Sequence, residues 1–289
     1  GQEQTVDLVL TAILANGHVL IEGVPGVAKT LLARLTARLI DADFSRVQFT
    51  PDLMPSDVLG TTVFNMKTNG FDFHQGPIFA DIVLVDEINR APAKTQAALF
   101  EVMEERQISI DGTTHRMGDL YTILATQNPV EQEGTYKLPE AQLDRFLMKI
   151  TMDYPSLEEE VNILERHHTN AALVKLDDIT PAITKEELLS LRAFMNQVFV
   201  DRTLLQYIAL IVQQTRTSKA VYLGASPRAS VAMLQSSKAY ALLQGRDFVT
   251  PEDIKFVAPY VLQHRLILTA EAEMEGYSPV KVTQRLIDK

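Results

Sequence analysis

Residues 18–39 read HVLIEGVPGVAKTLLARLTARL. A predicted strand at residues 18–22, with its apolar run at 19–21, leads into a loop with two glycines, and leucines then repeat with the period of a helix. Strand, glycine-rich loop and helix follow one another in this order in phosphate-binding loops, because backbone N–H groups at the start of a helix can hold phosphate oxygens. The stretch therefore predicts a phosphate site at a strand-to-helix turn.

The loop of this predicted site ends in a lysine and a threonine, as the phosphate-binding pattern requires. Alanine stands where a glycine usually precedes that lysine, and we expect this exchange to be tolerated if the alanine has a negative φ. The alternative is an ordinary turn with an exposed lysine. The predicted cofactor-binding residues of the loop are Gly23, Val24, Pro25, Gly26, Val27, Ala28, Lys29 and Thr30.

Short apolar runs alternate with helical patterns up to about residue 150, which is typical of βαβ units and a largely parallel sheet. Because the runs are nearly continuous, we expect strands that are covered on both faces. The predicted fold is α/β, with a five-stranded, largely parallel sheet followed by a smaller all-helical domain. The five predicted strands are 19–21, 47–49, 82–85, 121–125 and 146–150.

Helix-start patterns replace the strand pattern after about Asp153. Ser156 with Glu159, Thr184 with Glu187, and Thr250 with Asp253 all have the spacing of capping boxes. We therefore predict an α/β domain over residues 1–153 and a linker with the helical domain over residues 154–289. Residues 169–184 lack a sustained period and are the expected linker.

Two further strand ends carry polar residues that suit phosphoryl transfer. Asp86 and Glu87 follow the apolar run 82–85, where the first acid could hold Mg²⁺ and the second could polarise an attacking water. Asn128 follows the run 121–125 and could orient a water or a phosphate oxygen. Ligands of open α/β sheets sit beyond the carboxyl ends of strands, so these segments should converge. Read singly, the acids could be a solvated strand end and the asparagine a turn former.

Two arginines stand at notable positions. Arg228 follows Ser226 and a proline in the first turn of a predicted helix, where the helix dipole disfavours a cation by about 0.3–1 kcal/mol and a bound anion would offset that cost. Arg145 precedes the last predicted strand and could reach a phosphate on another subunit. A local ion pair with Asp144 is the simpler interpretation of Arg145.

The composition excludes several classes of protein. The 289 residues are 46% hydrophobic and 22% charged, as in globular proteins, and they include no cysteine for disulfides, thiol catalysis or zinc. The longest apolar stretch, at residues 204–212, is about half the length of a membrane-spanning helix, and no signal peptide opens the chain. A net charge of −10 disfavours general nucleic-acid binding. These properties are compatible with a cytoplasmic location.

Taken together, these residues resemble the MoxR family of AAA+ ATPases, over nearly the whole chain. The alanine before the loop lysine is itself the family's form of the motif. The matching segments are GVPGVAKT (23–30), QFTPDLMPSD (48–57), GPIFA (76–80), DEINRAP (86–92), ATQNP (125–129), EQEGTY (131–136), LPEAQLDRF (138–146) and GASPRA (224–229). Gln75 departs from the basic residue often found there.

The resemblance implies an αβα core with a helical lid, ATP and Mg²⁺ as cofactors, and a hexameric ring. It implies that Lys29 contacts the β- and γ-phosphates, that Thr30 and Asp86 bind the metal, and that Glu87 activates water. It further implies that Asn128 is sensor 1, that Arg228 is sensor 2 from the lid, and that Arg145 is an arginine finger.

The resemblance also implies insertions and partners. Residues 108–113 are similar to a hairpin before the sensor 1 strand, and residues 63–73 to the helix 2 insert. The family is associated with chaperone-like maturation of other proteins, often through partners with von Willebrand factor A domains. Two alternatives stay open: a nucleotide-dependent switch that hydrolyses ATP very slowly, and a DNA-acting motor of the same architecture.

Overall fold

The structure is a computed structural model that describes residues 2–24, 26–128, 136, 138–168 and 178–288. The chain forms two compact units. The first comprises Gly1–Glu3, Leu20–Lys137 and Thr151–Leu189, and the second comprises Gln4–Val19, Leu138–Ile150 and Ser190–Lys289. These units interleave along the sequence, and the domain boundary expected at residue 153 stays a prediction.

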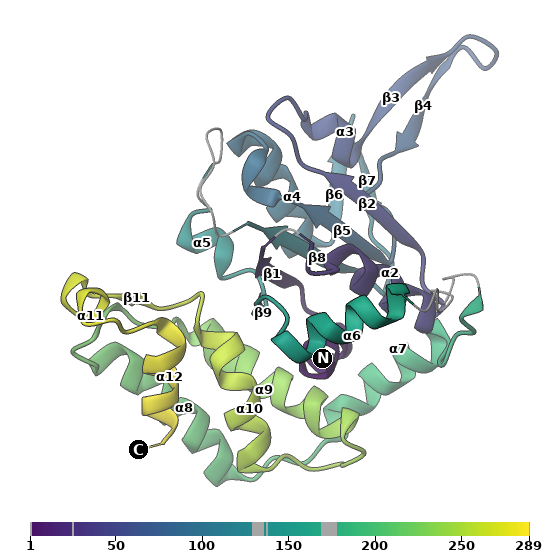
Figure 1. The fold of residues 1–289 in the computed structure, drawn as a ribbon. Helices are drawn as coiled ribbons and strands as arrows, with labels where there is room; N and C mark the ends of the chain where they lie inside the picture. Colours follow the sequence, from purple (N-terminus) through teal and green to yellow (C-terminus); the bar gives the residue numbers. More distant parts are fainter. Residues whose placement is uncertain (1, 25, 129–135, 137, 169–177, 289) are drawn as a thin grey trace. The chain divides into compact units, whose positions relative to one another are not determined.

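The central sheet has one strand for each of the five predicted runs, but the second strand begins three residues before its predicted range of 47–49 (Figure 1). They are β1 (Val19–Gly23), β2 (Phe44–Gln48), β5 (Ile82–Asp86), β8 (Thr122–Gln127) and β9 (Met148–Met152), in the order β2-β5-β8-β1-β9. β5 pairs in parallel with both β2 and β8. All five residues of β5 are buried, which confirms that it is covered on both faces, because successive side chains point to opposite sides of a strand. The expectation is wrong for the edge strand β2, where Arg46 and Gln48 are exposed. The predicted α/β class is confirmed.

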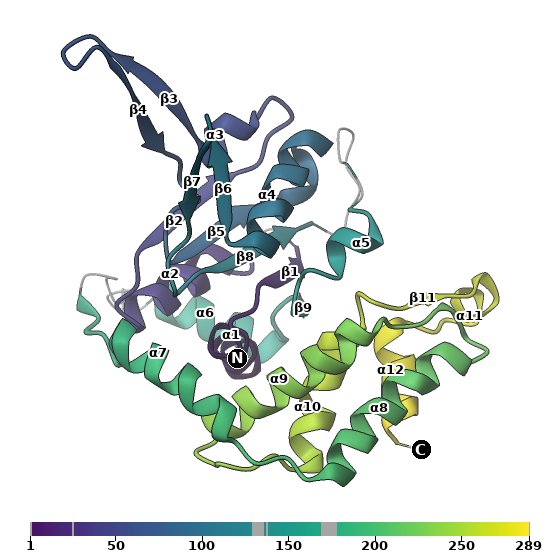
Figure 2. The same cartoon turned by 180° about the vertical axis from the view of Figure 1, so that it is seen from behind.

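Helices and two hairpins complete the first unit. α2 (Lys29–Leu39) packs on β5, and α4 (Ala93–Glu105) contacts α3 (Pro55–Leu59). The two segments expected to hold insertions both form antiparallel hairpins. Figures 1 and 2 show the hairpin of β3 and β4 extending away from the sheet. The hairpins are β3 (Gly60–Asn65) with β4 (Gly70–Gln75) and β6 (Gln107–Ile110) with β7 (Thr113–Arg116). The remaining elements of this part of the chain are η1 (Ile88–Arg90), α6 (Leu157–His168) and α7 (Lys185–Phe194).

The second unit is mainly helical, as expected, and α9 packs between α8 and α10. α12 also contacts α8 and α10, and one short antiparallel strand pair, β10 with β11, adds to the predicted helices. The elements are α1 (Glu3–Leu14), α5 (Glu140–Leu143), η3 (Met195–Gln197), α8 (Arg202–Thr217), β10 (Val221–Leu223), α9 (Pro227–Leu243), α10 (Pro251–Leu262), β11 (Ile267–Leu268), α11 (Ala270–Met274) and α12 (Pro279–Ile287).

The three predicted capping boxes are confirmed. At the start of α10, the N–H of Asp253 donates to the Thr250 hydroxyl and the Asp253 carboxylate accepts from the N–H of Thr250. The same reciprocal bonds join Ser156 with Glu159 and Thr184 with Glu187. Each box satisfies two N–H groups that a helix start leaves without a partner.

The end of the expected linker is docked on α2. The N–H of Ala182 donates to the carbonyl of Leu39 over 2.8 Å, and Nε of Arg38 donates to the carbonyl of Ile179 over 3.0 Å. The first bond satisfies a carbonyl that the C-terminal turn of the helix leaves without an intrahelical partner, and the second ties the linker backbone to the helix surface. The first part of the expected linker, residues 169–177, lies outside the described residues.

Candidate functional site

The loop after β1 needs glycine at two positions, for different reasons. A Cβ on Gly23 would lie 2.7 Å from the carbonyl oxygen of Met152, so a side chain does not fit there. Gly26 has a φ of +88° and open space around its Cα, which favours glycine on conformational grounds alone. Open space at Gly26 lets a ligand approach the backbone closely. Pro25, between them, lies outside the described residues.

The condition for tolerating alanine at position 28, a negative φ, is not met. This residue is the N-cap of α2 with φ 61° and ψ 25°, in the left-handed region, rather than in the first helical turn with a negative φ. The left-handed conformation at Ala28 is the last backbone turn before α2 begins. An alanine there costs about 1–2 kcal/mol relative to the right-handed form. Strain of this kind gathers at ligand sites.

The start of α2 has the features of an anion-binding site. No side chain caps it, and its first turn contains no acidic residue. The Lys29 ammonium is folded over the loop and donates to the carbonyl of Gly23 at 2.6 Å. Burial lowers the pKa of Lys29, and the nearby carboxylates of Asp86, Glu87 and Glu22 oppose that shift. Uncapped N–H groups with a cation beside them are what a phosphate group needs.

The first acid of the pair is buried and has a partner on each oxygen. The Thr126 hydroxyl donates to Oδ1 of Asp86 at 3.1 Å, and Nε of Arg46 donates to Oδ2 at 2.6 Å. The side chain of Asp86 is 10% exposed, whereas that of Arg46 is 50% exposed. Arg46 therefore approaches Asp86 from the solvent side, and Thr126 holds it from the neighbouring strand.

The second acid has a constrained backbone and two side-chain partners. Glu87 has a φ of 56°, which costs of order 1–3 kcal/mol for a residue other than glycine. Its N–H donates to the hydroxyl of Thr126 at 2.9 Å. Oε2 of its carboxylate accepts from Nε2 of Gln48 at 3.0 Å and from Nη1 of Arg90 at 2.8 Å.

Strand order explains why these groups meet. β2, β5 and β8 run in parallel side by side, so their carboxyl ends lie at one edge, with Gln48 in register with Asp86. Asn128 comes one residue after β8, at the same edge and half-buried. The predicted convergence of the loop lysine, the acids and the asparagine is therefore confirmed within the first unit.

The residues that hold the acids in place were not predicted from the sequence: they are Arg46, Gln48, Arg90 and Thr126. A signal was present for two of them. Arg46 and Gln48 alternate with the buried Val47 along β2, which is an edge strand of the sheet. Their side chains therefore lie on the same face of the strand, opposite to that of Val47. The identity of the neighbouring strand, and hence of their partners, depends on the order of strands in the sheet.

The site suits Mg²⁺ in its chemistry, since the hydroxyl of Thr30 and the carboxylate of Asp86 are both oxygen ligands. Thr30 is the second residue of α2, half-buried, and Asp86 ends the strand on which α2 packs. Among the described residues, no group of three His, Cys, Asp or Glu side chains is placed to hold an ion alone. A metal here would depend on ligand oxygens from a bound phosphate as well.

The two predicted arginines belong to the second unit. Arg228 is exposed in the first turn of α9, as expected, after the N-cap Ser226 and a proline. Arg145 is half-buried and follows Asp144, the C-cap of α5. Asp144 itself pairs with Arg265, Nε to Oδ1, at 2.6 Å. The local pair between Arg145 and Asp144 stays a prediction.

Two family models match the chain. The ATPase family associated with various cellular activities (AAA) matches residues 18–148, and the AAA lid domain matches residues 213–286. The first match contains the loop and the acid pair, and the second contains most of the helical part that carries Arg228.

Several relatives match almost the whole chain. YeaC of Bacillus subtilis is 47% identical over 99% of this chain and 89% of its own length. Chaperone MoxR1 of Mycobacterium tuberculosis is 45% identical over 99% of this chain and 77% of its own length. Protein MoxR of Methylorubrum extorquens is 30% identical over 95% and 85%. A crystal structure of a candidate ATPase from Cytophaga hutchinsonii is 41% identical, with a TM-score of 0.91 over 100% of this chain and 89% of that one.

Among the residues that the structure describes, no helix is both long enough and apolar enough to span a bilayer.

Proposed function

This chain belongs to the MoxR family of AAA+ ATPases, and we propose that it binds ATP with Mg²⁺, hydrolyses it in a ring of identical subunits, and uses the cycle to remodel or activate partner proteins. The observation that carries the proposal is the folding of Lys29 over an uncapped helix start beside Asp86 and Glu87. A cation and free N–H groups bind phosphates, and two carboxylates beside them supply what hydrolysis needs.

Each residue has a proposed role in this site. The loop from Gly23 to Thr30 holds the phosphates, with Lys29 on the β- and γ-phosphates. Thr30 and Asp86 hold Mg²⁺, which would neutralise the charge that develops on the phosphate oxygens. Glu87 orients and polarises the attacking water, and Asn128 contacts the γ-phosphate side of the site.

The two arginines of the second unit, Arg145 and Arg228, also have proposed roles at nucleotide sites. We assign Arg228 to the subunit's own nucleotide and Arg145 to the nucleotide of a neighbour, where an added cation stabilises charge in the transition state. A ring, expected to be hexameric, follows from that assignment. A chaperone-like role is supported by the relative called Chaperone MoxR1. A partner with a von Willebrand factor A domain and a cytoplasmic location remain predictions.

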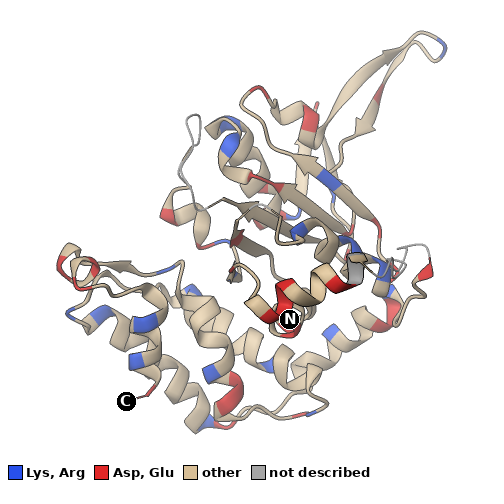
Figure 3. Ribbon diagram, viewed as in Figure 1, with Lys and Arg blue, Asp and Glu red and all other residues tan. Residues whose placement is uncertain are grey.

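The alternative of a slow switch has one observation in its favour. Gln48 and Arg90 both donate to Oε2 of Glu87 in the structure, so one of the two carboxylate oxygens is already engaged before any water is bound. Steady-state turnover with and without a partner protein separates a switch from a remodelling ATPase. The alternative of a DNA motor is less well supported, because the net charge is −10 and the described Lys and Arg residues are scattered among acids (Figure 3).

Glu87→Gln is the direct test of hydrolysis. The amide keeps the shape of the side chain but cannot act as a base, so ATP binding should persist and turnover should fall by at least 100-fold. Isothermal calorimetry measures the first and phosphate release the second. Glu101→Gln, on the exposed side of α4, is the matched control and should leave turnover unchanged. Parental turnover in Glu87→Gln would remove Glu87 from the mechanism.

Mixed assemblies test the role of Arg145 between subunits. Arg145→Ala subunits keep their own nucleotide site, and Lys29→Ala subunits keep their arginine, so each variant alone should be inactive. When the two are mixed, some interfaces pair an intact site with an intact arginine, and ATPase activity should return in part. Failure of every mixing ratio to restore activity would count against an arginine that acts across subunits.

A further inference from the structure

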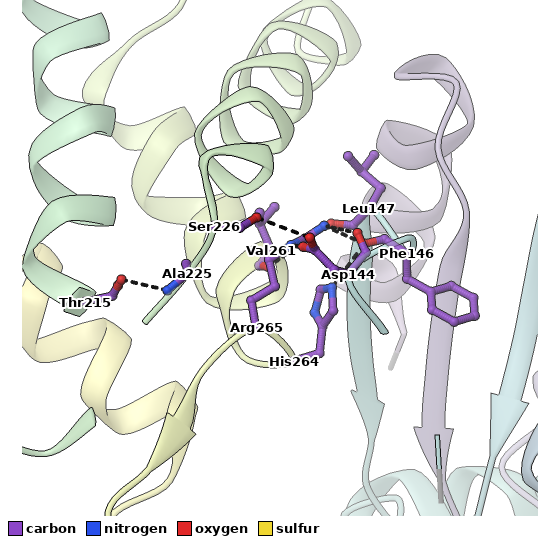
Figure 4. A network of polar contacts seen from close by, with 9 residues as sticks. All are labelled: Asp144, Phe146, Leu147, Thr215, Ala225, Ser226, Val261, His264 and Arg265. Carbon is purple, nitrogen blue, oxygen red and sulfur yellow. Dashed lines mark hydrogen bonds and ion pairs between the residues drawn. The ribbon is translucent and has the colours of Figure 1, made fainter. Parts of the chain in front are cut away.

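Arg265, just after α10, is a buried arginine whose donors are all used. Its side chain is 4% exposed, and each of its five guanidinium N–H groups has an acceptor within the second unit (Figure 4). Burial lowers the pKa of Arg265, and the charge of Asp144 opposes that shift. The acceptors are Oδ1 of Asp144 and the carbonyls of Asp144, Phe146, Leu147 and Val261.

Four of these five bonds go to one short segment of the chain. Nε reaches the Asp144 carboxylate at 2.6 Å, and the terminal nitrogens reach the carbonyls of Asp144, Phe146 and Leu147 at 3.2, 2.7 and 3.1 Å. The segment 144–147 therefore wraps around a single guanidinium. Arg145 lies inside this segment, so Arg265 fixes the backbone on both sides of it.

The same carboxylate also holds the start of α9. The Ser226 hydroxyl donates to Oδ2 of Asp144 at 3.2 Å. Ser226 is the N-cap of α9, yet its side chain makes no capping bond to its own helix. An N-cap bond stabilises a helix start, so Ser226 gives up a favourable local contact for the one to Asp144. Arg228 lies two residues further on, in the first turn.

α8 holds the start of α9 from a second direction. The N–H of Ala225 donates to the Thr215 hydroxyl at 3.0 Å (Figure 4). Nε of Arg216 donates to the carbonyl of Ala225 at 2.9 Å. Gly224 allows this approach, because a Cβ there would lie 2.7 Å from the Cα of Arg216. The segment 224–226 is thus anchored independently of Arg265.

We propose that Arg265 is a positioning residue that acts in trans: it holds the 144–147 segment so that Arg145 faces the neighbouring subunit's nucleotide, and the Asp144–Ser226 bond ties that segment to the helix start carrying Arg228. The inference rests on the proposed function. As a consequence, one hydrogen-bond network connects the segments that carry Arg228, assigned to the subunit's own nucleotide, and Arg145, assigned to the neighbour's.

Stability alone does not explain this arrangement. A buried ion pair often adds little net stability compared with apolar residues of similar volume, because both charges lose their hydration. The planar guanidinium instead fixes the geometry of its surroundings, because its N–H groups hold several acceptors at set angles at once. Lysine has three donors on a flexible stem and cannot reproduce that pattern.

The test places Arg265→Lys in one partner of the mixed assemblies at a time. The donor is Lys29→Ala, which supplies Arg145, and the acceptor is Arg145→Ala, which supplies the nucleotide site. In the donor, Arg265→Lys should lower the restored ATPase activity by fivefold or more. In the acceptor, whose Arg145 is already absent and whose α9 start remains held by α8, the loss should be less than twofold.

Controls separate positioning from general damage. Arg246→Lys changes another arginine–aspartate pair of the second unit, with Asp253, and should leave the restored activity unchanged when placed in the donor. If Arg265→Lys does not fold, Ser226→Ala in the donor carries the test and should cost two- to threefold. Equal losses in donor and acceptor, or no loss in the donor, overturn the inference alone. Absence of restored activity in the parent mixture overturns the proposed role of Arg145 as well.

Discussion

Arg46 and Asp86 form an ion pair between neighbouring strands, with Nε of Arg46 2.6 Å from Oδ2 of Asp86. Asp86 is the acid to which we assign Mg²⁺, so the guanidinium lies on an oxygen that the metal would use directly or through water. Nη2 of the same arginine donates at 3.2 Å to Gln48, whose amide in turn contacts Glu87. One exposed arginine is thus connected to both acids of the site.

Removing this cation should make the metal bind more easily. In Arg46→Ala, Asp86 loses a competing positive charge but keeps its bond from Thr126. Because Arg46 is half exposed, the pair is worth about 0.5–1 kcal/mol, which corresponds to about a two- to fivefold lower half-maximal Mg²⁺ concentration. A Mg²⁺ titration of a fluorescent, non-hydrolysable ATP analogue measures it. Arg34→Ala, which removes an exposed charge from α2, is the control. A higher Mg²⁺ requirement in Arg46→Ala would contradict the competition.

Local patterns made the sheet and the helix starts predictable. Apolar runs and capping spacings depend on residues close in sequence, and the strands and the three capping boxes were found where those patterns stand. The pair of Arg46 with Asp86 joins residues 40 apart, and the bond of Arg265 to Asp144 joins residues 121 apart. Such partners depend on strand order and helix packing, which no short window of sequence contains.

The conformation of Ala28 could not be predicted for a different reason. The identity of the residue favours a negative φ, and the closure of the loop between β1 and α2 overrides that preference. A family pattern with alanine at this position gives the residue type but not its backbone angles. The resulting strain is a property of the whole loop.

Ala28→Gly should therefore not destabilise the protein. Glycine removes about 1–2 kcal/mol of left-handed strain and adds about 0.5–1 kcal/mol of unfolded-state entropy, so the free energy of unfolding should stay equal or rise by up to about 1.5 kcal/mol. Urea denaturation gives the value. The matched change Ala97→Gly, at an exposed position inside α4, should instead cost about 1 kcal/mol. A similar loss in both variants would mean that Ala28 carries no strain.

His264 should make the protein sensitive to mild acid. Burial lowers its pKa well below the ordinary value, helped by the positive charges of Arg265 and Lys149, and its Nε2 lies 3.0 Å from the carbonyl of Phe146. The folded state therefore keeps His264 neutral, whereas the unfolded chain takes up a proton below about pH 6.5. Stability should fall as the pH drops through 6.5, and His264 alone should contribute about 1.4 kcal/mol of loss by pH 5.5.

His264→Gln isolates that contribution, because the amide can still contact the Phe146 carbonyl but does not titrate. Urea denaturation at pH 7.5 and pH 5.5 should show a smaller loss in the variant, by about 1.4 kcal/mol, than in the parent. Other histidines and carboxylates titrate in both proteins and cancel in the difference. An identical loss in both would show that the buried ring is protonated in the folded state.

Gly224→Ala should damage the start of α9 more than the fold as a whole. The added Cβ would lie 2.7 Å from the Cα and 2.8 Å from the N of Arg216, and backbone atoms cannot step aside as the end of a side chain can. Overpacking of this kind costs about 1–3 kcal/mol, and part of it is relieved if the 224–226 segment moves off α8. That movement would break the bond from the Ala225 N–H to Thr215 and shift Arg228.

The thermal unfolding temperature and the affinity for ATP should therefore both decrease in Gly224→Ala. Gly70→Ala, with no atom nearer than 3.8 Å to the new Cβ, should change stability by less than about 0.5 kcal/mol and leave ATP affinity unaltered. If Gly224→Ala lowers stability but binds ATP as the parent does, the position of Arg228 does not depend on this contact.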